Sequence, residues 1–281
     1  MIIEEALKIG KEALSELPSP QFETELLLSY VLKVNRSYLL AFPEKKLDEA
    51  LITQFQTLLA RRKKGEPFAY IAGEREFYGL SFIVNQETLI PRDDTEVIVD
   101  AALSLIPETL DIDTPFSLVD LGTGSGTIAL AIKSIRKDIH VTAVDYYHET
   151  LKVAQQNAKN NQLDVQFIQS NWFENLPLAA FDMIVSNPPY IDPVDHHLDG
   201  DGVKFEPKRA LVADQKGLFD LYHLIKTAPK YFKSSGWLLL EHGYDQREAL
   251  QAKMTEQGYI QVKTIKDYGN NDRVTLGYFK K

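Results

Sequence analysis

Cysteine is absent from the 281 residues, which excludes disulfides and thiolate metal sites. The amino-terminal stretch lacks a basic segment followed by an apolar one, as a secretory signal would have. No apolar run approaches the length needed to span a bilayer. We therefore expect a cytoplasmic protein without a membrane partner.

Positive charge is also scarce. Lys and Arg number 31 against 40 Asp and Glu, so the formal net charge is -9. This balance argues against a broad face that binds nucleic acid. The hydrophobic fraction of 44% and the charged fraction of 25% are those of an ordinary globular protein. The length favours a small domain joined to a larger one.

Residues 1–72 are predicted to be helical. Apolar residues recur at helical spacing between residues 47 and 64, and Ser37 is a plausible N-cap for a short helix that ends before Pro43. The helix predicted between residues 47 and 64 ends in four cations, residues 61–64, whose charge interacts favourably with the negative end of the helix dipole. We expect them to be solvated; contact with RNA or an acidic partner is the alternative.

The pattern changes at residue 73. Alternating apolar residues and a glycine in the segment 76–84 predict a short hairpin, and residues 73–91 are interpreted as a connector between two domains. Residues 92–281 then form the second domain, which starts with an apolar helix at 97–105.

The second domain alternates short apolar strands with helices. The predicted strands are 117–120, 141–145, 165–169, 181–186 and 237–241, and the predicted helices between them include 127–135, 149–160 and 218–232. This alternation is typical of an α/β fold, a mostly parallel sheet covered by helices on both faces. Residues 260–265 and 273–279 have no helix between them, which predicts an antiparallel hairpin at the edge.

One stiff turn stands at the end of the strand 181–186. Its residues are Asn187, Pro188, Pro189 and Tyr190. Two prolines cannot continue a strand, and a residue before proline is held extended. The turn offers an amide oxygen, a proline carbonyl and an aromatic ring. This set suits a planar –NH2 group, because the two oxygens can accept its N–H bonds and the ring can stack on its flat face. A strand exit capped by proline is the structural alternative.

A glycine-rich loop follows the strand 117–120. It comprises Gly122, Thr123, Gly124, Ser125 and Gly126. Alternate glycines let a ligand approach the backbone, and the helix that follows favours an anionic group. A dinucleotide fingerprint would need a glycine at the position of Thr127, so a carboxylate fits better than a pyrophosphate.

Three further side chains stand at strand ends. Asp145 could accept hydrogen bonds from both ribose hydroxyls of an adenosine group, or cap the following helix. Asn171 could meet an adenine edge, and Trp172 could stack on it, line the pocket or belong to the core.

Together the glycine loop, the acid and the Asn-Pro-Pro-Tyr turn resemble the class I, Rossmann-like methyltransferases that use S-adenosylmethionine. The turn narrows the resemblance to enzymes that methylate an –NH2 group on a flat π-system. These are the adenine-N6 DNA methyltransferases and the glutamine-N5 protein methyltransferases.

Further motifs resemble the release-factor glutamine methyltransferase (HemK-type) pattern over essentially the whole chain. They are the segments Ile90-Pro91-Arg92-Asp93-Asp94-Thr95-Glu96, Phe205-Glu206-Pro207-Lys208-Arg209-Ala210-Leu211, Glu241-His242-Gly243 and Asn271-Asp272-Arg273-Val274. The resemblance implies a seven-stranded sheet and methylation of the glutamine in the Gly-Gly-Gln motif of class I peptide chain release factors. Adenine-N6 DNA methylation is the alternative. The chain departs from the family at Asn171, commonly Asp, and at residues 212–217, where only the last glycine of a glycine-rich stretch remains.

The resemblance also implies roles for the residues. Asn187, Pro188, Pro189 and Tyr190 would be catalytic; Gly122 to Gly126, Asp145, Asn171, Trp172 and Asn187 would bind the cofactor. The helical domain would recognise the release factor, and no direct DNA binding is expected.

A long connector follows the turn. Four acids and two histidines between residues 192 and 201 match no metal-ligand spacing, so a solvated, mobile loop without metal is expected. Because long loops in compact domains often bind or cover ligands, residues 191–217 are expected to cover the substrate.

Overall fold

The computed structural model describes residues 1–111 and 114–281. Its contacts divide the chain into two compact units. The first comprises Met1–Gly73 with Gly200–Phe205, and the second comprises Glu74–Asp199 with Glu206–Lys281. Nowhere in the described parts is there a helix long and apolar enough to cross a membrane.

The first unit is helical. Its helices are α1 (Ile3–Ala13), α2 (Pro20–Leu32), α3 (Arg36–Ala41), α4 (Glu49–Lys63) and α5 (Phe68–Ala72). Pro20 occupies the first turn of α2, where its missing N–H is not needed. Gly10 lets α1 and α2 pack closely, because a Cβ there would lie 2.3 Å from Thr24 Cγ2. Apolar side chains from these helices, such as Leu27, Leu28 and Phe55, form one core.

The predicted N-cap of the third helix was wrong. The N-cap of α3 is Asn35, whose side chain accepts from the Tyr38 N–H at 3.0 Å, and Ser37 lies inside the helix. Asn and Ser are equally good caps, so their order along the chain does not decide between them.

The cations that end α4 are not all solvated as predicted. Arg62 is buried, and it pairs with Glu23 (Nε–Oε2 2.9 Å) and with Asp201 (Nη2–Oδ2 2.5 Å). Asp201 belongs to the loop that was expected to be solvated, and it is exposed while it forms this ion pair within the unit. A buried charge needs such partners, and here they come from residues 39 and 139 positions away.

The second unit begins with the predicted hairpin. Strands β1 (Glu74–Phe77) and β2 (Leu80–Ile83) pair antiparallel. The two residues between them, Tyr78 and Gly79, have φ of 51° and 74°. Positive φ at both central positions is the geometry of a tight hairpin turn.

Within the described residues, the sheet has seven strands in the order β5-β4-β3-β6-β7-β9-β8. The parallel part consists of β3 (Ser117–Leu121), β4 (His140–Asp145), β5 (Gln166–Gln169), β6 (Phe181–Ser186) and β7 (Phe232–Glu241). The last two strands, β8 (Ile260–Lys266) and β9 (Asp272–Lys280), are antiparallel. The predicted α/β class and the antiparallel final hairpin are confirmed.

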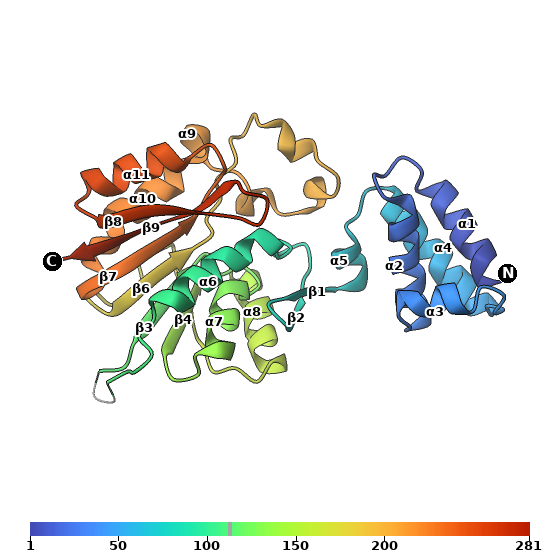
Figure 1. The fold of residues 1–281 in the computed structure, drawn as a ribbon, viewed down its shortest axis with the longest axis horizontal. Coiled ribbons are helices and arrows are strands. Elements are labelled where there is room, and N and C mark those ends of the chain that lie inside the picture. The colour runs from blue at the N-terminus through green and yellow to red at the C-terminus, as the bar shows by residue number, and fades with distance from the viewer. Residues whose placement is uncertain (112–113) are drawn as a thin grey trace. The chain divides into compact units, whose positions relative to one another are not determined.

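Helices cover both faces of this sheet (Figure 1). On one face, helices α6 (Glu96–Leu105), α7 (Thr127–Ile135) and α8 (His148–Asn160) contribute to one apolar core. On the other, α10 (Phe219–Thr227) and α11 (Arg247–Glu256) contribute to a second core. The chain runs from β3 to β4 in one direction and returns to β6 on the other side of β3. Ligands bind at such reversals in open α/β sheets, outside the carboxyl ends of the strands.

One boundary was wrong in the second unit. The helix expected at 218–232 ends at Thr227, and Phe232 begins strand β7. Pro229 has no N–H to continue the helix, so the chain passes through a short 3-10 turn, Ala228–Lys230. The remaining short helical pieces are the 3-10 turns Asp93–Thr95, His196–Asp199, Val203–Phe205 and Lys208–Ala210, and α9 (Asp214–Gly217).

Candidate active site

A cavity of about 440 Å³ lies in the second unit, against the loops that follow β3, β4, β5 and β6. Every residue of the glycine loop except Gly126 lines it, together with Asp145, Asn171, Trp172, Asn187 and Pro189. The fold therefore gathers most of the predicted site residues in one place, as expected for the carboxyl edge of a parallel sheet.

The glycine loop is shaped by left-handed backbone. Gly122 and Gly124 have φ of 71° and 59°, a region in which side chains are strained. The Thr123 N–H donates to the Val144 carbonyl at 2.8 Å, and the Thr123 hydroxyl donates to Asp120 Oδ2 at 2.7 Å. A Cβ on Gly124 would meet nothing within 4 Å. Hydrogen bonds to Val144 and Asp120 therefore hold the loop in place, while its surface at Gly124 faces open space.

Asp145 lies at the end of β4 and is almost fully buried. Its Oδ2 accepts from the Gly124 N–H and its Oδ1 from the Tyr147 N–H, both at 3.0 Å. The N-cap of α8 is Tyr147, so the alternative reading of Asp145 as that cap is wrong. Burial raises the pKa of Asp145, and these two backbone donors oppose the rise. The carboxylate therefore joins the glycine loop to the segment that follows β4.

Asn171 and Trp172 form part of the wall after β5. Asn171 is exposed, and its Nδ2 donates to Glu174 Oε1 at 2.8 Å. Trp172 has φ 49°, and its ring approaches within 3.3 Å of a Cβ built on Gly122. The ring also packs against the second core cluster, so the pocket and core readings of Trp172 both hold.

The Asn-Pro-Pro-Tyr turn is divided between cavity and core. The Ser186 hydroxyl fixes the strand end by donating to the Leu121 carbonyl at 2.6 Å. Asn187 and Pro189 line the cavity, whereas Pro188 and Tyr190 are absent from its described lining. The Tyr190 ring packs against the second core cluster, and its hydroxyl donates to Glu241 Oε1 at 3.3 Å.

Glu241 is a buried acid next to the Asn-Pro-Pro-Tyr turn, and the sequence pattern had not predicted a role for it. It ends β7 and is 1% exposed. Burial raises its pKa to about 7, while the charge of Arg273 and the hydrogen bond from the Tyr190 hydroxyl oppose the rise. The segments that contain Thr95 and Glu241 had been noted, but no role had been assigned to either side chain.

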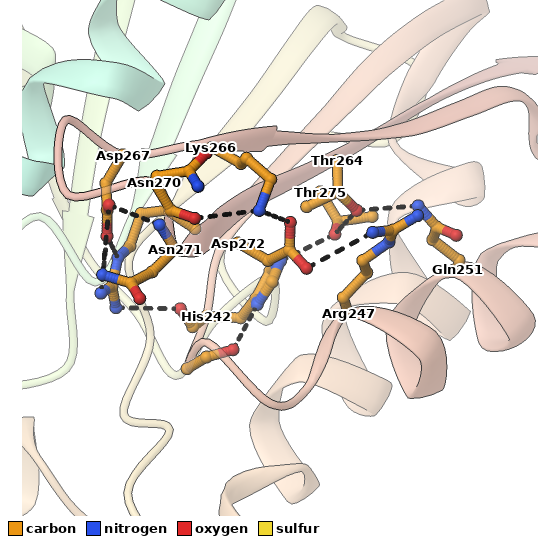
Figure 2. A network of polar contacts seen from close by, with 12 residues as sticks. His242, Arg247, Gln251, Thr264, Lys266, Asp267, Asn270, Asn271, Asp272 and Thr275 are labelled. Carbon is orange, nitrogen blue, oxygen red and sulfur yellow. Dashed lines mark hydrogen bonds and ion pairs between the residues drawn. The ribbon is translucent and has the colours of Figure 1, made fainter.

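Figure 2 shows a network of polar contacts that includes Asp267, His242 and Thr275, and the contacts of Arg273 belong to it. Arg273 Nη2 pairs with Asp267 Oδ2 at 2.9 Å, and its Nη1 donates to the His242 carbonyl at 3.2 Å. The His242 ring lies 2.7 Å from the Thr275 hydroxyl. This network fixes a positive charge near the buried Glu241 carboxyl group.

We expect Glu241→Gln to change how stability depends on pH. A carboxyl whose pKa is about 7 in the folded protein and near 4.5 when unfolded holds its proton more tightly in the folded state. Its contribution to stability is complete below pH 4.5 and is lost as the pH rises through 7. Glutamine does not titrate. The free energy of unfolding would be measured in urea for both ligand-free proteins between pH 5 and pH 8. The difference between variant and wild type should shift in favour of the variant by about 2.5 kcal/mol from the lower to the upper pH. Parallel curves would contradict this prediction.

Two ion pairs fasten the rim of the cavity. Arg209 pairs with Glu87, and its guanidinium lies 4.2 Å from the centre of the Tyr147 ring. Glu206 pairs with Arg92 and accepts from the Ile90 N–H at 3.0 Å. These contacts join the segment that follows Phe205 to the segment that follows the hairpin. Arg92, Glu206 and Arg209 belong to two motifs that were noted in the sequence, whereas Glu87 belongs to neither. The partners lie 114 and 122 positions apart, so no local pattern reveals that they meet.

No group of three or more His, Cys, Asp or Glu side chains that could hold a metal is present in residues 1–111 and 114–281.

The loop that follows the Asn-Pro-Pro-Tyr turn is held by contacts of its own backbone. Ile191 bridges Val212, and a Cβ on Gly217 would lie 1.9 Å from the Tyr190 carbonyl oxygen. Gly217, the retained glycine of this stretch, is therefore required by close backbone packing.

Comparison with known proteins agrees with this geometry. Residues 5–73 match a family model described as the PrmC N-terminal domain, and residues 95–199 match one described as the methyltransferase small domain. A methyltransferase of known structure from Pyrococcus furiosus has a TM-score of 0.54 and 19% identity, and covers 79% of this chain and 96% of its own. That likeness concerns the fold alone.

The curated relatives match over nearly their full length. The release factor glutamine methyltransferase of Aliivibrio fischeri is 48% identical over 92% of this chain and 90% of its own. The enzyme of the same name from Shewanella oneidensis is 46% identical over 92% and 89%. The function class expected from the motifs is thereby confirmed. At this identity and coverage, the chain belongs to the release factor glutamine methyltransferase family.

Proposed function

We propose that the protein transfers a methyl group from S-adenosylmethionine to the N5 amide nitrogen of the glutamine in the Gly-Gly-Gln motif of class I release factors. One observation carries the proposal: Asn187, most of the glycine loop and Asp145 line the same cavity. A cofactor bound to the loop would therefore lie beside an acceptor for a planar –NH2 group.

The residues present fit the cofactor. The left-handed glycines leave open space above the loop, and the amino end of α7 favours a carboxylate there. Asp145 can accept from ribose hydroxyls with the lone pairs that the backbone N–H groups leave free. Asp220, half-buried in the same wall, adds a negative charge that suits a cationic ligand. When bound, S-adenosylmethionine supplies an activated methyl group.

The residues of the turn would act on the acceptor nitrogen. An amide nitrogen is a weak nucleophile because its lone pair is delocalised. Asn187 Oδ1 and the Pro188 carbonyl would accept its two N–H bonds, which orients the nitrogen and supports the positive charge that develops on it. Tyr190 was expected to stack on the acceptor group, but its ring packs against the second core cluster outside the described lining of the cavity, so we propose that it supports the turn. The proton can leave after methyl transfer.

The helical unit would recognise the release factor. It has its own core, and it coincides with the match to the PrmC N-terminal domain. We propose residues 1–72 as this recognition domain, 73–91 as the connector and 92–281 as the methyltransferase domain.

We expect labelled S-adenosylmethionine to label a class I release factor at a single glutamine. The purified enzyme would be offered the release factor, a variant of it in which the Gly-Gly-Gln glutamine is leucine, and adenine-containing DNA. Mass spectrometry would then map the label. The expected result is one labelled glutamine in the wild-type substrate and none in the variant or in the DNA. Label on adenine, or equal labelling of the leucine variant, would refute the proposal.

A further inference from the structure

We infer that Gln246 is a positioning residue that holds the Asn-Pro-Pro-Tyr turn in the geometry needed for methyl transfer. The inference rests on the proposed role of that turn. It concerns a side chain outside the described lining of the cavity, 56 positions after Tyr190.

The turn has few backbone donors of its own. Pro188 and Pro189 carry no N–H group, so they cannot form the hydrogen bonds that usually hold a turn. Donors from other parts of the fold must therefore fix its two ends. At the first end, the Ser186 hydroxyl donates to the Leu121 carbonyl at 2.6 Å. At the second end, the Tyr190 carbonyl needs a donor of the same kind.

Gln246 supplies this second donor. It stands at the start of α11 and is 7% exposed. Its Nε2 donates to the Tyr190 carbonyl at 2.9 Å and to the Lys216 carbonyl at 3.1 Å, and its Oε1 accepts from the Gly243 N–H at 2.9 Å. All three contacts require the same orientation of the amide, because the reverse would place its oxygen against two carbonyls. The side chain thus joins the turn to the end of the loop 191–217 and to the segment after β7.

The backbone that reaches this amide from the loop is strained. Gln215 and Lys216 have φ of 56° and 59°, in the left-handed region that residues with a side chain rarely adopt. At Gly217, a Cβ would lie 1.9 Å from the Tyr190 carbonyl oxygen and 2.7 Å from Gln246 Nε2. Strained backbone persists where its surroundings fix it, and it is concentrated at functional sites. The contacts of Gln246 are among those that fix this segment against the turn.

A displaced turn would affect the reaction at the acceptor nitrogen. The Asn187 oxygen and the Pro188 carbonyl belong to the same short stretch as Tyr190, and the fixed φ of proline transmits a movement from one end to the other. A misplacement of about 1 Å can lower a rate about 10²-fold. The glycine loop and Asp145 have no printed contact with Gln246 and follow other strands. Loss of Gln246 should therefore impair methyl transfer and spare the binding of the cofactor.

We expect Gln246→Met, which keeps the length of the side chain and removes its donors, to lower the single-turnover rate of methyl transfer to a release factor about ten- to a hundredfold. Cofactor affinity, measured by calorimetry, should stay within about twofold. Gln251→Met is the matched control, because it makes the same change in the same helix and removes the hydrogen bond from Gln251 Nε2 to Thr264 Oγ1 at 2.8 Å (Figure 2). It should keep the wild-type rate.

Gln246→Glu tests the donor itself. At about pH 8 the new carboxylate still accepts from the Gly243 N–H, but it cannot donate to the Tyr190 carbonyl. Its rate should therefore fall at least as far as that of Gln246→Met. This variant also takes the place of the methionine variant if thermal melting shows the latter to be unfolded.

A double-mutant cycle separates positioning of the acceptors from a general loss of packing. In an Asn187→Ala background, one of the two positioned acceptors is already gone, so Gln246→Met should cause a smaller loss of rate than it does in the wild type. Equal losses in both backgrounds, a wild-type rate for Gln246→Met, or a loss of cofactor affinity as large as the loss of rate would overturn the inference while leaving the proposed function intact. If Asn187→Ala alone kept the wild-type rate, the proposed function itself would fail.

Discussion

Asn187→Ala is expected to lower the single-turnover rate of glutamine methylation about 10²–10³-fold, with a far smaller change in cofactor affinity. Removal of one preorganised partner of a charge that develops in the transition state typically has an effect of this size. The structure places Asn187 in the cavity wall at the end of a central strand, with its nitrogen held by Thr95. In the proposed mechanism its oxygen accepts from the substrate nitrogen, whose N–H bonds become stronger donors as the methyl group moves.

The measurement is a rapid-mixing assay with saturating cofactor and release factor, together with a calorimetric affinity for the cofactor. Asn187→Asp keeps an acceptor and loses the –NH2 donor, so its rate should lie between those of the alanine variant and the wild type. A wild-type rate for Asn187→Ala at saturation would require another account of how the amide nitrogen is activated.

Asp145→Ala is expected to weaken cofactor binding about ten- to a hundredfold, because a charged acceptor of a hydrogen bond typically contributes about 1.5–3 kcal/mol. The carboxylate also accepts from the Gly124 N–H, so its loss frees the glycine loop as well. Asp145→Asn retains one acceptor oxygen and should bind with intermediate affinity.

Titration calorimetry with S-adenosylmethionine tests this expectation, and thermal melting confirms that each variant is folded. Asp164→Ala, which removes one exposed acid outside the described lining of the cavity, controls for the change of net charge. An unchanged affinity in a folded Asp145→Ala variant would exclude the ribose-binding role.

Local chemistry made much of the fold predictable. Strand–helix alternation predicted the parallel sheet, and two β-strand patterns without an intervening helix predicted the antiparallel end. The glycine loop and the proline turn were recognisable because glycine and proline restrict or release the backbone at their own positions. The start of α3 was misplaced because Asn35 and Ser37 are both suitable N-caps. The start of β7 was misplaced because Pro229 ends the preceding helix earlier than predicted.

Most elements and both loops could be predicted from the residues, because each depends on interactions within a few positions of the chain. The meeting of distant side chains could not be predicted, because it depends on how the elements pack. The tertiary structure buried Arg62 between Glu23 and Asp201. It also brought Asn187 to Thr95 and Tyr190 to Glu241. Those partners come from different elements, and a hydrogen bond or ion pair forms only when the packed fold brings them within about 3 Å. No periodicity along the chain encodes that distance.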